Sequence, residues 1–229
     1  MVEHDRTYLP AAGHHWSLPL YDPLVKLLGG NAARKLLLDQ AAVRPSHRVL
    51  DIGCGTGTLI VMIKSEYPNI EVVGLDPDPR ALVRARRKGQ RAGLSIQLDR
   101  GFSDELPYPE GAFDRVFSSF MLHHLETAEQ ETTLREVRRV LKPGARFHLL
   151  DFATPDSNSA GRLARWLHST HRLKDNSDER ILNLMRQAGL LDPKRVAGRA
   201  LLVGHIAYYQ ASAPTSTPNA TPSAASGID

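Results

Sequence analysis

Cysteines and long apolar segments are scarce in this chain of 229 residues. Its single cysteine, Cys54, cannot form a disulfide within the chain, so we expect a reducing, cytoplasmic location. The longest apolar run, residues 59–63, is far shorter than the ~18 residues that a membrane-spanning helix needs. The first residues contain acids and no apolar core, so we expect neither a signal peptide nor membrane insertion.

The overall composition is that of a globular protein, with 41% hydrophobic and 24% charged residues. We expect one folded domain over residues 46–210, preceded by a lid segment and a helix in residues 1–45. Residues 211–229 are nearly all small, polar or proline. Such a segment cannot bury enough apolar surface to become ordered, so we predict a disordered tail.

The charge balance is mildly basic, with a formal net charge of +4, and six positive charges lie between Arg80 and Arg91. One interpretation is a surface for nucleic acid or another anionic partner. The other is the exposed face of an amphipathic helix. Ala81, Leu82 and Ala85 supply an inward face at helical spacing, which favours the amphipathic helix.

Short β-rich runs alternate with helical patterns along most of the chain. This alternation predicts a doubly wound α/β sheet with helices on both faces. The helix over 128–141 is expected to start with a capping box of Thr127 and Gln130 and to stop at Pro143-Gly144. We expect strands at 47–52, 70–75, 94–98, 113–119, 146–152, 195–203 and 205–210, and helices at 31–43, 58–66, 79–92, 128–141, 157–173 and 177–188.

A glycine-rich loop follows the first expected strand. Gly53, Gly55 and Gly57 allow the backbone to turn sharply and to approach a ligand closely, and the next helix offers free N–H groups. Thr58 stands where a dinucleotide-binding loop has its third glycine. The loop therefore predicts a nucleotide-like ligand and disfavours NAD.

Two acids accompany this loop. Asp51 precedes the first glycine by two residues, and Asp76 ends the second expected strand. A carboxylate at the end of that strand can accept hydrogen bonds from both hydroxyls of a ribose. Both acids therefore belong to the predicted site.

Four blocks in order, VLDIGCGTG, VGLDPDP, ELPYPEGAFDRVFSSFMLHHL and LREVRRVLKPGARFHLLDF, resemble class I S-adenosylmethionine-dependent methyltransferases. The resemblance covers residues 47–152 and points to the small-molecule group that includes the ubiquinone/menaquinone methyltransferases. It implies a Rossmann-like sheet, mostly parallel with an antiparallel last strand. It also implies S-adenosylmethionine as the cofactor and a methyl transfer as the activity.

The resemblance also assigns cofactor contacts to individual residues. Asp51 is placed near the methionyl amino group, the glycine loop beneath the cofactor, and Asp76 at the ribose. Members of the family often have an Asp directly after Gly101 that bonds the adenine; this chain has Phe102. The cofactor-binding residues expected on this basis are Asp51, Gly53, Cys54, Gly55, Gly57, Asp76, Pro77, Phe102, Ser103 and Ser118.

The chemistry of a sulfonium methyl group needs alignment of the nucleophile more than a dedicated catalytic group. Where a proton must be removed, His124 after the fourth strand is our candidate base. We expect Tyr21, His123, Asp151 and Trp166 to contact the substrate. His168 and His171 are three residues apart but lack a third ligand, so no metal is expected.

The methyl acceptor is narrowed by motifs that are missing. The fourth strand ends in SSFM, whereas enzymes that methylate exocyclic amino groups of bases have an Asn/Asp-Pro-Pro-aromatic motif. Quinone enzymes typically carry Phe-Gly-x-Arg-Asn where this chain has FMLHHL. We predict a small or amphipathic organic acceptor. The alternatives are a nucleic-acid methyltransferase and a non-catalytic cofactor-binding module, and the oligomeric state stays open.

Overall fold

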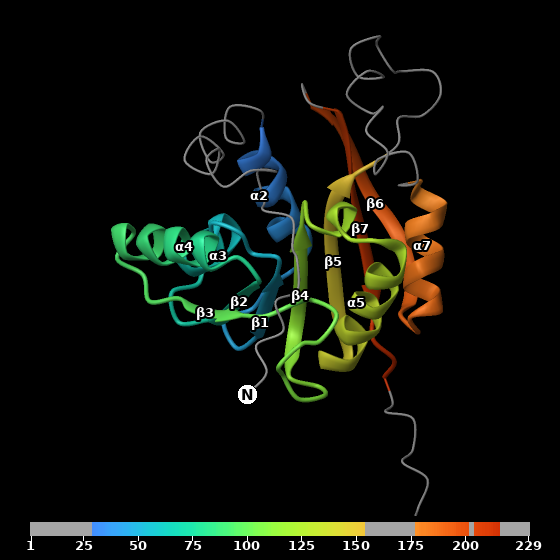
Figure 1. Ribbon diagram of the computed structural model, residues 1–229, viewed down its shortest axis with the longest axis horizontal. Helices are drawn as coiled ribbons and strands as arrows, with labels where there is room; N and C mark the ends of the chain where they lie inside the picture. The colour runs from blue at the N-terminus through green and yellow to red at the C-terminus, as the bar shows by residue number, and fades with distance from the viewer. Residues whose placement is uncertain (1–28, 154–176, 202–203, 216–229) are drawn as a thin grey trace, which may run out of the picture.

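A seven-stranded sheet runs through the part of the chain that the computed structural model describes, residues 29–153, 177–201 and 204–215 (Figure 1). Its strand order is β3-β2-β1-β4-β5-β7-β6. The strands are β1 (Arg48–Ile52), β2 (Glu71–Asp76), β3 (Gln97–Arg100), β4 (Phe113–Ser119), β5 (Leu141–Phe152), β6 (Leu191–Leu201) and β7 (Gly204–Ser212).

The sheet is mostly parallel, as predicted. β1 pairs in parallel with β2 and β4, β2 with β3, and β4 with β5. The last strand, β7, is antiparallel to both β5 and β6. Residues 49–52 of β1 are buried on both faces, the apolar pattern that a covered parallel strand requires.

Helices cover both faces of this sheet (Figure 1). One apolar core lies under α2, α3 and α4, and a second lies under α5 and α7. The doubly wound architecture is therefore confirmed for the described residues. The helices are α2 (Gly30–Gln40), α3 (Thr58–Glu66), α4 (Pro79–Arg91), α5 (Thr127–Val140) and α7 (Asp178–Gln187), with a 3-10 turn η1 (Leu122–His124) after β4.

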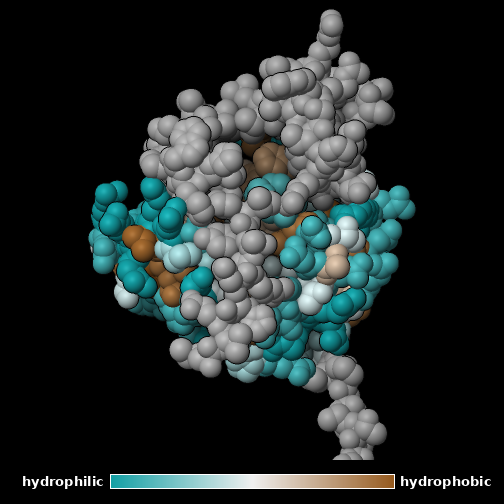
Figure 2. Space-filling view, in the orientation of Figure 1, coloured by the Kyte–Doolittle hydropathy of each residue, from teal (hydrophilic) through white to brown (hydrophobic). Residues whose placement is uncertain are grey.

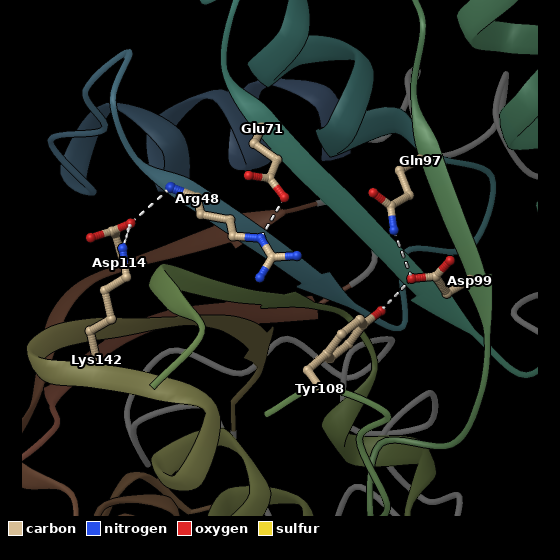
Figure 3. Close-up of polar contacts among 7 residues, drawn as sticks. All are labelled: Arg48, Glu71, Gln97, Asp99, Tyr108, Asp114 and Lys142. Atoms are coloured by element: carbon tan, nitrogen blue, oxygen red, sulfur yellow. Dashed lines mark hydrogen bonds and ion pairs between the residues drawn. The ribbon is translucent and has the colours of Figure 1, made fainter. Parts of the chain in front are cut away.

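Charged side chains join the amino ends of four neighbouring strands (Figure 3). Asp114 of β4 accepts from the backbone N–H of Arg48 on β1 at 2.9 Å and from Lys142 Nζ on β5 at 2.7 Å. Arg48 Nε donates to Glu71 Oε1 on β2 at 2.5 Å. These contacts favour one register of the strands at their amino ends. The carboxyl ends of the same strands lie at the opposite edge of the sheet.

The basic cluster lies on α4, as the amphipathic interpretation predicts. Ala81, Leu82 and Ala85 are buried, and Arg80 and Arg91 are exposed. Figure 2 shows hydrophilic residues on the side of the molecule where α4 lies, with an apolar patch among them. The charges therefore have a structural explanation as the solvated side of a helix.

The start of α5 differs from the prediction. The capping box consists of Glu126 and Glu129, one residue before the expected pair of Thr127 and Gln130. The backbone at Glu126 is extended (φ −71°, ψ 160°), which is the conformation of an N-cap, whereas Thr127 is already helical. The hydroxyl of Thr127 accepts instead from Arg180 on α7 at 3.0 Å.

Several strand boundaries were also wrong, and the strand expected to start at residue 195 starts at Leu191 as β6. The third strand begins at Gln97 and not at residue 94, because the Leu94 N–H still donates to Gly89 O at the end of α4. The helix expected to run to 141 ends at Val140, and β5 starts directly at Leu141 and passes through Pro143-Gly144. A register shift between β4 and β5 accommodates this segment.

The expected tail begins too early. Residues 211 and 212 still belong to β7, where they pair with residues 147 and 146 of β5, and Ala213 is buried. Most of the predicted tail, the predicted helix over 157–173, Tyr21, Trp166, His168 and His171 lie outside the described residues. No helix within the described ranges is long and apolar enough to cross a membrane.

A buried histidine in the sheet makes stability depend on pH. The ring of His148 on β5 stacks on Phe117 at 5.4 Å, and its Nε2 has no hydrogen-bond partner among the described residues. Burial, together with the positive charges of Arg115 and Arg146, lowers the pKa of His148 to about 3. The folded protein therefore keeps this imidazole neutral under conditions where the unfolded chain protonates it.

We predict that stability falls as the pH drops below 6.5, the ordinary pKa of histidine, because only the unfolded state gains this proton. The slope from this residue approaches about 1.4 kcal/mol per pH unit. Urea unfolding of wild type and His148→Leu between pH 7 and 4.5 measures it, and the variant is expected to lose less stability. Identical pH dependence in the two proteins would contradict the prediction.

Candidate functional site

A cavity of about 360 Å³ opens where β1, β2 and β4 end. Crevices at the carboxyl ends of parallel strands, on either side of the point where strand order reverses, are the usual ligand sites of such sheets. Here that point is β1, which lies between β2 and β4. The cavity is lined by Arg34, Gly53, Cys54, Gly55, Thr56, Thr58, Leu75, Asp76, Pro77, Gly101, Phe102, Ser103, Ser119, Phe120, Met121, His124, Leu125, Glu126 and Glu129.

The glycine loop forms one wall, and each of its glycines meets a different requirement. All three have positive φ, a conformation that L side chains rarely adopt. A Cβ on Gly53 would lie 2.3 Å from Met121 Cγ, and one on Gly57 would lie 2.8 Å from Ala85 Cβ. A Cβ on Gly55 would meet nothing within 4 Å, so it would occupy the cavity that Gly55 lines.

Asp76 holds the loop against the end of β2. One carboxylate oxygen accepts from the Gly55 N–H at 2.8 Å, and the other accepts from the Asp78 N–H at 2.9 Å. Burial raises the pKa of Asp76 to about 6, although both hydrogen bonds lower it. Each oxygen keeps a second lone pair, and Asp76 lines the cavity, so it can still accept from a ligand.

Asp51 is a buried acid beside the glycine loop. It is 1% exposed, and neither carboxylate oxygen has a hydrogen bond among the described residues. Burial raises the pKa of Asp51 to about 7; the positive charge of Arg34 opposes this and the negative charge of Asp76 adds to it. A buried, unsatisfied carboxylate is costly, so this position is suited to a cationic ligand group.

Arg34 of α2 brings a positive charge to the cavity. Its side chain is 6% exposed, its Nε donates to Ser119 Oγ at 3.3 Å, and its guanidinium lies 5.2 Å from the centroid of the Phe120 ring. Phe120 has a φ of +58°, and its N–H donates to Leu150 O at 2.8 Å, so the chain turns sharply where β4 ends.

Two adjacent histidines follow this turn. His124 lines the cavity, and its ring lies 4.0 Å from that of His123. His123 is turned toward Asp151 at the end of β5, with its Nδ1 2.5 Å from Asp151 Oδ1. His124 therefore faces the cavity, and His123 faces the protein.

The structure brings most of the predicted cofactor residues together. Those that line the cavity are Gly53, Cys54, Gly55, Asp76, Pro77, Phe102 and Ser103, joined by the candidate base His124. Asp51, Gly57, Ser118, His123 and Asp151 lie in the surrounding layer and do not line it. Ser118 is 1% exposed with no hydrogen bond to its hydroxyl among the described residues, and Ser119 faces the cavity in its place.

Sequence reasoning did not identify Arg34, Glu126 or Glu129 as site residues. Arg34 is the informative omission, because an arginine between the apolar positions Ala33 and Leu37 of a helix is at odds with a simple apolar face. Glu126 and Glu129 form the capping box at the start of α5, and both line the cavity.

Known proteins share both the sequence pattern and the fold. A family model described as "Methyltransferase domain" matches residues 49–144. Demethylmenaquinone methyltransferase from Thermus thermophilus is 38% identical over 150 residues, covering 64% of this chain and 67% of the relative. The enzyme of that name from Deinococcus radiodurans is 35% identical over 150 residues, covering 64% of this chain and 61% of the relative.

A solved structure agrees with the fold. The YcgJ protein from Bacillus subtilis superposes with a TM-score of 0.67 at 18% identity, covering 80% of this chain and 98% of that one. The fold and the sequence matches together show that the chain belongs to the class I S-adenosylmethionine-dependent methyltransferases. It is a small-molecule methyltransferase of the group resembling the ubiquinone/menaquinone enzymes, and its cofactor is S-adenosylmethionine.

We predict that Asp51→Asn binds the cofactor more weakly than wild type and is more stable relative to wild type as the pH rises. Because the pKa of Asp51 is raised to about 7, the wild-type protein loses stability as the pH rises from the ordinary value of 3.8 through 7. The amide does not titrate, so the variant gains on wild type by up to about 1.4 kcal/mol per pH unit in this window. Urea unfolding at pH 5 and pH 8 measures the gain.

Asp39→Asn on the exposed side of α2 is the matched control for replacing a carboxylate by an amide outside the cavity. Calorimetry with S-adenosylhomocysteine should show that only Asp51→Asn binds more weakly, by at least about tenfold. Equal pH dependence of wild type and Asp51→Asn would show that Asp51 does not carry the buried charge.

Proposed function

We propose that this enzyme transfers a methyl group to a small amphipathic acceptor of the quinol type, an aromatic ring with a hydroxyl group and an apolar substituent. The observation that carries the proposal is the lining of the cavity beyond the glycine loop. Phe120, Met121 and Leu125 offer apolar contacts there, and His124 offers one imidazole. The names of the relatives from Thermus and Deinococcus support the same class of acceptor.

The cofactor would be held by the polar groups around the loop. Asp76 accepts the ribose hydroxyls, and Asp51 compensates the methionyl ammonium group. Gly55 leaves room for the cofactor to pass close to the backbone. The positive charge of the methionyl ammonium group supports the place of Asp51, because this buried carboxylate has no hydrogen bond among the described residues.

The remaining contacts follow from the cavity lining. Pro77 and Phe102 would pack against the adenine, since both line the end of the cavity near β2 and β3. Arg34 would bind the carboxylate of the methionyl group. Its Nε donates to Ser119, and its two terminal nitrogens have no hydrogen-bond partner among the described residues, so they can donate to a carboxylate. Arg34 and Asp51 together complement the two charges of an amino acid.

Bound S-adenosylmethionine supplies a methyl group already activated toward a nucleophile. The protein then has to align the acceptor with the S–CH3 bond and exclude water. His124 would accept the proton of the acceptor hydroxyl. The oxygen, or the ring carbon that its electrons activate, would then bond the methyl carbon, and the electron pair of the carbon–sulfur bond would leave with S-adenosylhomocysteine. A methylated ring carbon would lastly release its hydrogen as a proton. An imidazole suits this role because its ordinary pKa lies near neutral pH.

Turnover of a defined panel tests this function. Reduced naphthoquinones with and without an alkyl chain are incubated with the enzyme and S-adenosylmethionine, and the gain of one methyl group is measured by mass spectrometry. We expect methylation of the ring acceptors and at least about a hundredfold slower reaction in His124→Ala. Methylation of RNA or of small amines, with none of the quinols, would overturn the proposal.

Cofactor binding is tested separately by a pair of glycine variants. Gly55 and Gly93 both have positive φ, and a Cβ on either would meet nothing within 4 Å, but only Gly55 lines the cavity. We expect Gly55→Ala and Gly93→Ala to lose similar stability, about 1 kcal/mol, because both strain the backbone. Only Gly55→Ala should weaken S-adenosylhomocysteine binding in calorimetry, by at least about tenfold, because the added methyl group occupies space in the cavity.

In wild type, S-adenosylhomocysteine at about 100 times its dissociation constant should stabilise the fold by about 2.7 kcal/mol. Thermal unfolding therefore has to shift upward with this ligand and not with NAD. Equal binding by the two glycine variants would place the cofactor away from Gly55.

A further inference from the structure

A buried carboxylate holds the histidine next to the candidate base. Asp151, near the end of β5, has no exposed surface. One of its oxygens accepts from the backbone N–H of His123 at 3.0 Å. The other is 2.5 Å from His123 Nδ1 and accepts from the Phe152 N–H at 2.8 Å. One side chain of β5 thus holds both the backbone and the ring of a residue that follows β4.

The chemistry of this contact defines the state of the ring. An ionised carboxylate only accepts hydrogen bonds, so Nδ1 of His123 is the donor. In the neutral ring the lone pair then lies on Nε2, and both the tautomer and the ring orientation are set. The edge of this ring packs against Phe152 at a centroid distance of 5.1 Å.

The His123 ring in turn supports His124. The two rings are 4.0 Å apart at an interplanar angle of 41°, and of the two only His124 lines the cavity. Two positive charges on adjacent imidazoles at this distance would repel each other, so the two histidines disfavour being protonated together. The negative charge of Asp151 behind His123 attracts one proton to the two imidazoles and so favours a singly protonated pair.

The turn has other anchors besides Asp151. Gln130 of α5 donates to Leu122 O at 3.0 Å and to Leu125 O at 3.1 Å. The Phe120 N–H bonds Leu150 O at 2.8 Å, and the His124 N–H bonds Met121 O at 2.9 Å. The backbone is thus held without the bond between the ring and the carboxylate, which points to a purpose for that bond beyond folding.

We propose that His123 and Asp151 are positioning residues for His124. The His123 ring orients His124 toward the acceptor, and the charge of Asp151 compensates the positive charge that His124 gains when it takes the acceptor proton. This inference rests on the proposed function, in which His124 is the base. Asp151 does not line the cavity, so in this arrangement it acts on the acceptor through His123 and His124, whereas the sequence predicted a direct contact with substrate.

The test compares Asp151→Asn with wild type on a series of quinols whose hydroxyl pKa is lowered stepwise by halogen substituents. Asparagine keeps the shape of the side chain and removes its charge. We expect kcat to fall about 10- to 100-fold for the least acidic acceptor, and progressively less as the acceptor ionises on its own. The dissociation constant of S-adenosylhomocysteine should change less than about twofold, because Asp151 does not line the cavity.

A pair of His123 variants separates positioning from packing. The amide of His123→Asn can donate to Asp151 from nearly the place of Nδ1, whereas His123→Leu leaves the carboxylate without that donor. We expect His123→Asn to retain more activity than His123→Leu. The proposal is overturned if Asp151→Asn slows every acceptor by the same factor, or if it weakens cofactor binding as much as turnover.

If wild type methylates none of the quinols, the proposed acceptor class fails, and the positioning pair is judged by nuclear magnetic resonance of the S-adenosylhomocysteine complex. Arg34 on α2, Asp76 on β2 and Glu126 and Glu129 on α5 line the cavity with His124 and are the same in both proteins. Replacing Asp151 by Asn should therefore move the titration of His124 to lower pH. An unchanged His124 titration would overturn the proposal.

Discussion

The hydrogen bonds between the glycine loop and the end of β2 are the interaction on which the site depends. Leu75 O accepts from the N–H groups of Gly53 and Cys54 at 2.8 and 3.0 Å, and Asp76 accepts from Gly55 at 2.8 Å. These bonds continue the pairing of β1 and β2 past the last residue of β1. They hold the loop in a left-handed conformation that glycine adopts at low cost, so the loop is shaped before a ligand arrives.

Among the groups of this site, the carboxylates are those whose burial lowers the stability of the folded protein most. Asp51 and Asp76 are buried with raised pKa values, and Asp151 is buried beside an imidazole. In the proposed arrangement Asp51 compensates the ammonium group of the cofactor, Asp76 accepts from its ribose hydroxyls, and Asp151 compensates a proton on His124. Stability of the empty protein and affinity for its ligand are thus opposed, as is common where function requires buried charge.

The fold could be predicted over most of the described chain because its signals are local. The helix over Thr58–Glu66 and the strand over Phe113–Ser119 have the predicted bounds, since periodicity, glycines and apolar runs mark them directly. The errors occur where a distant contact decides the boundary. Residues 211 and 212 have the composition of the tail, but they pair with residues 147 and 146 of β5 on the side of that strand away from β4. Likewise, β5 continues past Pro143 because the Gly144 N–H donates to Pro214 O and Ala145 O accepts from the Ala213 N–H, and β4 pairs with β5 on either side of this segment.

The sequence by itself determined the class of the enzyme and the side of the cavity formed by the glycine loop. Those residues follow one another on a strand, its loop and the next strand, so their spacing is also their arrangement in space. Only the tertiary structure decided the side that Arg34 and His124 line. Arg34 reaches Ser119 across 85 residues, and Asp151 reaches His123 across 28. Such contacts form because separate strands end at one edge of the sheet, a consequence of strand order that no local pattern records.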